Sequence, residues 1–339
     1  MRVYYKLKKI NSIFLFLTCM LCILFNCSLF SLSQESLREV TVLLEWVPNT
    51  NHTGIYVALE KGFYREEGLK VNVVQPEEGG AAPFIAAGQG EFGFSHQEQV
   101  TFARTADEPL PVVAVAAILQ HNTSGFASPV EKRIKHPRDF EGKKYGGWGS
   151  PIEEATIKAL MERDGADFSK TEIIAIGAID FFAAVQKYVD YTWIYYGWDG
   201  VASEVNDFPI NFIFLQDYAP ELDLYTPVII VSEQLRVSEP ELIRKFLRAT
   251  EKGYQFSIEN PELAVQDLLK NAPEINREIA IASQEYLAQE YQADAPYWGV
   301  MEVERWENYA RWLYQRGLID RMLDAEAAFD NSFLPGKGN

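Results

Sequence analysis

The chain has 339 residues, with 48 acidic against 31 basic side chains and a formal net charge of −17. Such an acidic protein is a poor partner for nucleic acid or anionic lipid, so we expect neither. All three cysteines lie within the first 27 residues, which excludes disulfides, thiolate metal sites and cysteine nucleophiles from the rest.

The first 33 residues have the pattern of an export signal and are set aside from the fold. A cationic start precedes an apolar run from Ile13 to about Phe30, and removing residues 1–33 leaves 27 basic against 48 acidic side chains, a net charge of −21. Cys27 follows Leu-Phe-Asn, which resembles a relaxed lipobox, so we predict lipid attachment there. Cleavage after Ser33 and an uncleaved anchor are the alternatives. A lipid at Cys27 would hold the protein at a membrane without a spanning helix.

The remaining 300 or so residues alternate β-rich and helical segments, which is typical of an α/β chain with largely parallel pairing. Strands are expected at 40–44, 70–74, 92–95, 112–119, 144–145, 172–176, 189–195, 212–215 and 226–231. Helices are expected at 54–61, 83–87, 96–105, 152–163, 181–188 and 199–206, and again after residue 235. The firmest helix starts are a capping box at Ser238-Glu239-Pro240-Glu241 and the pair Asn260-Pro261.

The polar stretch from Gly125 to Phe140 is expected to cross into a second lobe. Residues 226–231 are expected to form the strand that returns the chain to the first lobe. We therefore predict a first lobe from 34–126 and 227–339, and a second lobe from 127–226. Two crossings with both termini on one lobe describe a hinged clamshell, which closes over a ligand. Together with export, this organisation indicates a solute receptor for an importer.

No catalytic or metal-binding constellation can be singled out. The four histidines lack paired metal spacing, and Ser95 and Ser150 lack the strand–elbow sequence of a hydrolase nucleophile. The glycines of Gly146–Gly149 do not have the spacing of a phosphate loop. We therefore predict no metal, no cofactor and no enzymatic activity, with an enzyme acting on an aromatic ring as a distant alternative.

Polar and aromatic residues gather instead where predicted strands end and helices begin. Ligands of open α/β sheets bind at the carboxyl ends of strands, where helix N-termini present free N–H groups. The turn after 40–44 and the end of 92–95 supply one set of candidate ligand-binding residues: Trp46, Asn49, His52, Tyr56, Ser95 and Gln97.

A second candidate set surrounds the end of strand 189–195 and a glycine-rich loop: Trp148, Tyr195, Tyr196, Trp198 and Asp199. Alternation places Tyr191, Trp193 and Tyr195 on one face of that strand. Aromatic surfaces on both lobes suit a planar heteroaromatic ligand, and Asp199 can accept a hydrogen bond from a ring N–H. The alternative is that these rings belong to the core, and it is strongest for Trp193.

Three motifs, Trp46–Gly54, Lys61–Leu69 and Gly90–Gly93, resemble the thiamine-precursor-synthesis (pyrimidine synthase-like) solute-binding proteins. The resemblance implies a type II periplasmic-binding-protein fold and work as the receptor of an ABC importer for a B-vitamin or its ring precursor. Permease and ATPase subunits would be the partners. In the pyrimidine receptors a tryptophan and a tyrosine sandwich the ring while a carboxylate pairs with its amino group. The matching positions are Trp46, Tyr195 or Tyr196, and Asp199.

The resemblance also bears on activity and ligand. Eukaryotic members are pyrimidine-making enzymes with a cysteine-rich motif and a lysine where this chain has Ser95, so that activity is rejected. Riboflavin is favoured because Trp46, Trp148, Tyr195 and Trp198 offer more stacking surface than one small ring can use. Formylaminopyrimidine and hydroxymethylpyrimidine are the alternatives. We expect a monomer, lipid-anchored and facing the periplasm or exterior, or else a soluble periplasmic protein.

Overall fold

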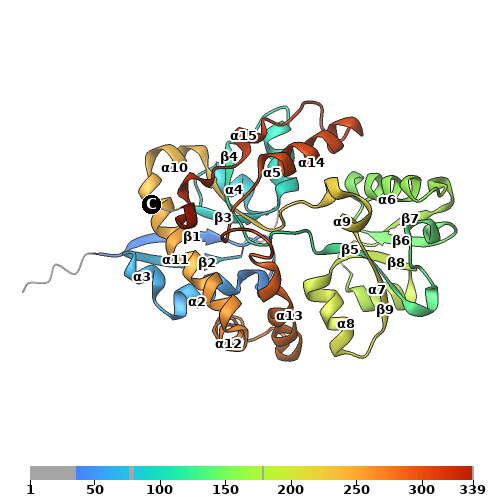
Figure 1. The fold of residues 1–339 in the computed structure, drawn as a ribbon, viewed down its shortest axis with the longest axis horizontal. Coiled ribbons are helices and arrows are strands. Elements are labelled where there is room, and N and C mark those ends of the chain that lie inside the picture. Colours follow the sequence, from blue (N-terminus) through green and yellow to red (C-terminus); the bar gives the residue numbers. More distant parts are fainter. Residues whose placement is uncertain (1–35, 76–79, 178, 338–339) are drawn as a thin grey trace, which may run out of the picture. The chain divides into compact units, whose positions relative to one another are not determined.

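The computed structural model describes residues 36–75, 80–177 and 179–337 (Figure 1). From Arg38 onward the described residues form one compact unit. The predicted leader at 1–33, and Cys27 with it, lies outside the described residues. Among the helices that are described, none is at once long and apolar enough to cross a bilayer.

Two five-stranded sheets organise the chain. The first has the order β2 (Leu69–Val74), β1 (Arg38–Leu43), β3 (Phe92–Ser95), β10 (Val228–Ser232) and β4 (Val112–Ala117). The second has the order β7 (Glu172–Ala175), β6 (Lys144–Gly147), β8 (Tyr191–Tyr195), β5 (Ser124–Pro129) and β9 (Ile210–Phe214). In each sheet the fourth strand runs antiparallel to both neighbours, and the other described pairings are parallel. The predicted α/β fold with mixed sheets is confirmed, although antiparallel pairings are as frequent as parallel ones.

Helices cover both faces of each sheet (Figure 1). Those of the first part are α2 (Thr53–Glu60), α3 (Phe63–Glu66), α4 (Ala82–Ala86) and α5 (Gln97–Thr105). The second part has α6 (Pro151–Arg163), α7 (Phe181–Lys187), α8 (Val201–Val205) and α9 (Leu215–Tyr218). After β10 come α10 (Glu233–Ser238), α11 (Pro240–Glu259), α12 (Pro261–Asn271), α13 (Arg277–Glu290), α14 (Val303–Gln315) and α15 (Ala325–Ala328).

Strand β5 was not expected from the sequence, which predicts a polar crossing from Gly125 onward. Instead Ser124–Pro129 is buried along its whole length between β8 and β9. Apart from Phe126 and Pro129 this strand consists of serine, glycine and alanine, without alternation or β-branched side chains, so its sequence gives no strand signal. Gly125 is required there, because a Cβ would lie 2.2 Å from the carbonyl oxygen of Ile213. The predicted lobe boundary at 126/127 falls inside this strand.

The predicted capping box at Ser238 is also wrong. Ser238 is the last residue of α10, and α11 begins at Pro240 with Glu239 as its N-cap residue and no side-chain cap. Helix α14 serves both cores, since Trp306 packs with the first sheet and Trp312 with the second. The division into lobes therefore stays a prediction, and α14 belongs to neither sheet alone.

Residues 118–123 and 215–227 connect the two sheets and are bonded to each other. The Ile118 N–H donates to the Pro227 carbonyl at 2.9 Å. The Asn122 N–H donates to the Asp223 carboxylate at 2.9 Å, and His121 Nδ1 lies 2.8 Å from the same carboxylate. These two crossings place the carboxyl ends of β3 and β8 opposite one another.

Candidate functional site

The turn after β1 forms the first wall and exposes an indole. Trp46 has 61% of its surface exposed, although it follows a buried strand. The turn is held by Asn49, whose side chain accepts from the Asn51 N–H at 2.8 Å and donates to the Val47 carbonyl at 3.0 Å. This cap starts the short helix η1 (Thr50–His52), so the Asn49 amide has its partners within the turn.

His52 is fully buried beneath that turn and positions Glu45. Its Nδ1 accepts from the Asn49 N–H at 3.1 Å, and its Nε2 lies 3.0 Å from the Glu45 carboxylate. Burial alone would raise the pKa of Glu45, but His52, together with the more distant His96, lowers it overall. Both ring nitrogens of His52 are therefore engaged within the protein.

Three other predicted ligand-binding residues are also buried and engaged. Tyr56 packs on the far side of α2 against Leu268 of α12. The Ser95 hydroxyl donates to the Gln99 side chain at 3.0 Å. Gln97 accepts from the Tyr225 N–H at 2.9 Å and donates to a carbonyl of α14. Their predicted ligand contacts stay untested, but the side-chain polar atoms of Ser95 and Gln97 already have protein partners.

The glycine-rich loop before α6 forms part of the second wall and is held by one carboxylate. Glu153 is 1% exposed and accepts from the backbone N–H groups of Trp148, Gly149 and Ser150 at 2.8–3.1 Å. It also accepts from the Tyr145 hydroxyl at 2.5 Å. The loop thereby presents the Trp148 ring, which is 53% exposed.

Beside the Trp148 ring, Trp193 lies 5.9 Å away between ring centroids. Its buried indole N–H has no hydrogen-bond partner among the described residues. As alternation predicts, Tyr191 and Trp193 belong to the core cluster on one face of β8, with Ile194 in the cluster on the other.

The second wall continues at the end of β8 with Tyr195, which is 40% exposed. The one-turn π-helix η5 (Tyr196–Gly200) follows and carries Trp198 and Asp199, both half-buried. Tyr196 differs from its neighbours, because its hydroxyl donates to Glu204 and its ring packs on Phe212, Phe214 and Tyr286. Tyr195 rather than Tyr196 is therefore the tyrosine with an available face.

The two walls meet where the His96 ring lies over the Tyr195 ring. Their centroids are 6.4 Å apart and their planes differ by 19°. His96 Nδ1 also lies 2.6 Å from the Thr226 hydroxyl on the second crossing. Burial lowers the pKa of His96, with the Glu45 charge opposing it, and so favours the neutral imidazole. Burial of the Tyr195 hydroxyl end, followed by the Glu98 charge, raises the pKa of Tyr195 to about 12.

Two carboxyl groups, Glu45 and Glu98, lie near this contact, since both charges act on the Tyr195 hydroxyl and the Glu45 charge also acts on His96. Burial raises the pKa of Glu98 to about 7, assisted by Glu153 and opposed by a 3.2 Å hydrogen bond from Tyr309. Burial, and then the Asp180 charge, raises the pKa of Asp199 to about 7. The region between the ends of β3 and β8, called the crevice below, therefore places the hydrogen-bond acceptors Glu45 and Glu98 near the His96 and Tyr195 rings. None of the site residues named here is lysine or arginine. Such a set suits a ring with N–H or amino donors.

The sequence analysis missed Glu45, His96, Glu98, Glu153 and Thr226. A usable signal existed for Glu45 and His96, because each stands directly after a predicted strand. Glu153 sits at the N3 position of α6, where a capping box places a glutamate. Among the described residues, no group of three histidine, cysteine or acidic side chains is arranged to hold a metal ion.

The raised pKa of Asp199 gives a testable pH dependence. A neutral carboxyl is favoured in the folded state, so its stabilising contribution is complete below about pH 4 and is lost as the pH rises to about 7. Asp199→Asn is expected to remove that decline. Partial exposure screens the effect, so we expect a gain of about 1–2 kcal/mol in the free energy of unfolding at pH 8. Urea denaturation at pH 5 and pH 8 checks this. The exposed Asp217→Asn is the control, and an equal gain in both variants would contradict the assignment.

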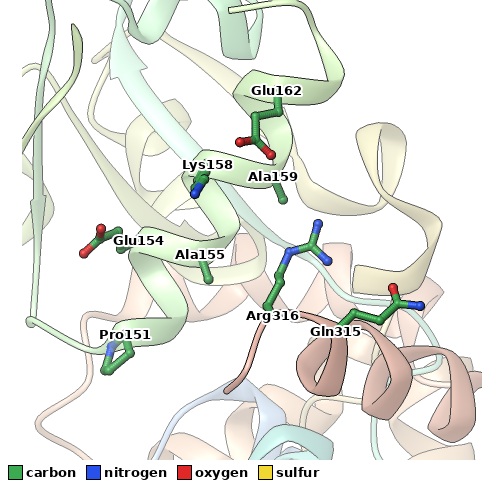
Figure 2. A pocket seen from close by; sticks show the side chains of 8 residues that line it. All are labelled: Pro151, Glu154, Ala155, Lys158, Ala159, Glu162, Gln315 and Arg316. Atoms are coloured by element: carbon green, nitrogen blue, oxygen red, sulfur yellow. The ribbon is translucent and has the colours of Figure 1, made fainter. Parts of the chain in front are cut away.

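A separate pocket of about 670 Å³ lies between α6 and the end of α14 (Figure 2). Glu154, Lys158 and Glu162 line one side, and Arg316 lies opposite them. The Arg316 guanidinium stacks 4.4 Å from the Trp312 ring. None of the predicted site residues lines this open, mixed-charge pocket.

The two mixed sheets, each flanked by helices and joined by two crossings, define a periplasmic-binding-protein fold. The structure is similar to a putative periplasmic sulfonate-binding protein SsuA from Methylobacillus flagellatus, with a TM-score of 0.65 and 15% identity. The alignment covers 88% of this chain and 93% of that one. A model described as NMT1/THI5 like matches residues 49–264. The chain belongs to the NMT1/THI5-like family, which confirms the resemblance found in the motifs.

Relatives in this family include both binding proteins and proteins named as enzymes. A formylaminopyrimidine-binding protein of Halalkalibacterium halodurans is 30% identical over 88% of this chain and 91% of that protein. A riboflavin-binding protein, RibY, of Chloroflexus aurantiacus is 25% identical over 90% and 88%. A protein of Legionella pneumophila named as a 4-amino-5-hydroxymethyl-2-methylpyrimidine phosphate synthase is 24% identical over 90% and 95%.

Proposed function

We propose that this protein binds a flat, nitrogen-containing ring of a B-vitamin or its precursor and delivers it to an ABC importer. The observation that carries the proposal is the apposition of Tyr195 and His96, which brings the ends of β8 and β3 together. The turn after β1 and the glycine-rich loop add the exposed indoles of Trp46 and Trp148, whereas core residues would bury their indoles. Stacking supplies about 0.5–1.5 kcal/mol beyond area burial, and the carboxyl groups supply orientation.

Among such rings we propose an aminopyrimidine of the formylaminopyrimidine type. The support is the 30% identical binding protein and the carboxyl groups of Glu45, Glu98 and Asp199, which can accept from an amino group. Riboflavin, the ligand favoured by the sequence analysis, is the second candidate. It is supported by the large exposed faces of Trp46, Trp148 and Tyr195, and by the relative RibY.

Binding without turnover is the proposed activity, although some relatives are named as synthases. Ser95 stands where the resemblance places the lysine of those enzymes, and it is fully buried and bonded to Gln99. Among the described site residues named above, none carries an amine that could replace it. Partnership with permease and ATPase subunits, export, and a lipid at Cys27 belong to the same proposal.

Calorimetric titration of the full chain tests this function. Formylaminopyrimidine, hydroxymethylpyrimidine and riboflavin are each titrated, and the recovered ligand is analysed by mass spectrometry. We expect saturable binding of one ring with its mass unchanged. At a hundredfold excess over the dissociation constant, the ligand should add about 2.7 kcal/mol to the free energy of unfolding. A yellow, fluorescent preparation would decide for riboflavin. No binding of any ring, or an altered product mass, would refute the proposal.

A further inference from the structure

We propose that Ser283 of α13 is a positioning residue whose buried hydroxyl couples the two walls of the crevice. One wall is the turn from Trp46 to η1, and the other is η5 with Trp198 and Asp199. The role of these walls in ligand binding rests on the proposed function. The mechanical coupling between them rests on the contacts alone.

The coupling is a chain of two hydrogen bonds. The Ser283 hydroxyl donates to the carbonyl of Gly197, the second residue of η5. The Thr50 hydroxyl of η1 lies 2.6 Å from the Ser283 oxygen. Because the Ser283 hydroxyl has one proton and a carbonyl can only accept, Thr50 is the donor of the second bond. Thr50 and Ser283 are 1% and 0% exposed, so water cannot replace either bond.

Further contacts of α13 reinforce both ends of this chain. The Tyr291 hydroxyl, two turns after Ser283, donates to the Thr50 carbonyl at 2.6 Å. On the other side a Cβ at Gly197 would lie 2.7 Å from the Leu287 side chain, so η5 is seated directly on α13. Tyr286 packs against Tyr196 at 5.3 Å between ring centroids. One face of α13 thus touches both walls at successive turns.

Through these contacts the Ser283 hydroxyl links the positions of the two walls to each other. Gly197 directly precedes Trp198 and Asp199, and Thr50 directly follows Asn49, the cap of the turn that carries Trp46. Moving either wall breaks a buried bond to the same hydroxyl. A ligand that orders one wall therefore favours the bound position of the other. The sequence offers no signal for this, since Ser283 is an ordinary polar residue within a helix.

Hydrogen exchange and ligand affinity in Ser283→Ala test the coupling. Loss of the Ser283 hydroxyl leaves the buried Gly197 carbonyl without its hydrogen-bond donor. We therefore expect faster amide exchange in residues 49–53 and 196–201 together. The affinity for formylaminopyrimidine or riboflavin, whichever binds the unaltered full chain, is expected to fall about tenfold. Thr50→Val removes only the bond between Thr50 and Ser283, so it is expected to give the same two changes to a lesser degree. Thr50→Ser keeps the hydroxyl and is expected to leave amide exchange and affinity unchanged.

Ser257→Ala is the matched control, because Ser257 is also a fully buried serine that donates to a carbonyl, but within α11. It is expected to leave exchange in both walls and the affinity unchanged. Faster exchange in one wall alone, in neither wall, or equally in the control would overturn the coupling. If no ring binds the unaltered chain, the proposed function fails, and the exchange measurements still decide the role of Ser283.

Discussion

Tyr195→Ala is expected to weaken binding of the preferred ring by about 1–3 kcal/mol, a five- to 150-fold increase in the dissociation constant. The ring of Tyr195 is 40% exposed at the end of β8 and faces His96 across the crevice. Removing it deletes a stacking surface without emptying the core. Trp46→Ala is expected to have a similar effect, because its indole is 61% exposed. Calorimetry measures the affinity, and thermal unfolding without ligand reports on the fold.

Tyr188→Ala is the control for these two substitutions. Tyr188 is 57% exposed and precedes β8, so it stands at the opposite end of the strand from Tyr195. Its removal should change neither affinity nor fold. If Tyr195→Ala instead lowers the unfolding temperature and leaves the affinity of the folded protein unchanged, Tyr195 is a structural residue and the stacking assignment is wrong.

The largest effect on stability is expected from Glu153→Ala, with a loss of about 3 kcal/mol in the free energy of unfolding. Glu153 alone satisfies three consecutive backbone N–H groups and the buried Tyr145 hydroxyl. Hydrogen bonds to a charged acceptor are worth more than neutral ones, and this substitution removes several at once. Glu153→Gln is expected to be nearly as damaging, because its amide NH₂ would face other donors. Urea denaturation measures both variants.

Glu154→Gln provides the comparison for Glu153, since the neighbouring side chain is exposed and faces the separate pocket (Figure 2). It is expected to change stability by less than about 0.5 kcal/mol. A Glu153 variant as stable as the Glu154 variant would show that the glycine-rich loop holds its shape without the carboxylate.

The fold could be predicted wherever burial on one or both faces left an apolar pattern. Strands β1, β2, β3 and β4 fall close to the expected ranges, because Val, Leu and Phe side chains enter the core. Strand β5 could not be found this way, since Ser, Gly and Ala leave no hydrophobic pattern. Its place is decided by pairing with β8 on one side and β9 on the other, and Gly125 is the position where the neighbouring strand leaves no room for a Cβ.

The site was predictable by region but not by side chain. A position after a strand indicates proximity to the crevice, and Trp46, Trp148, Tyr195, Trp198 and Asp199 remain candidates on that ground. Such a position does not reveal which polar atoms form hydrogen bonds within the protein and are therefore not free to bind a ligand. Asn49, His52 and Gln97 each have a partner fixed by the fold, from a cap to a contact with another helix. The position of His96 after a predicted strand indicates the region, but its stacking partner Tyr195 stands about a hundred residues later in the chain and is known only from the structure.

The paired crossings restrict how the two sheets can move. A single tether would permit rotation in any direction, but here residues 118–123 and 215–227 are bonded to each other at Ile118 and at Asn122. Twisting one sheet about the long direction of the connection would shear those bonds, whereas bending both segments together preserves them. If the two predicted lobes open and close, we therefore expect the paired segments to confine that motion to bending about a single axis.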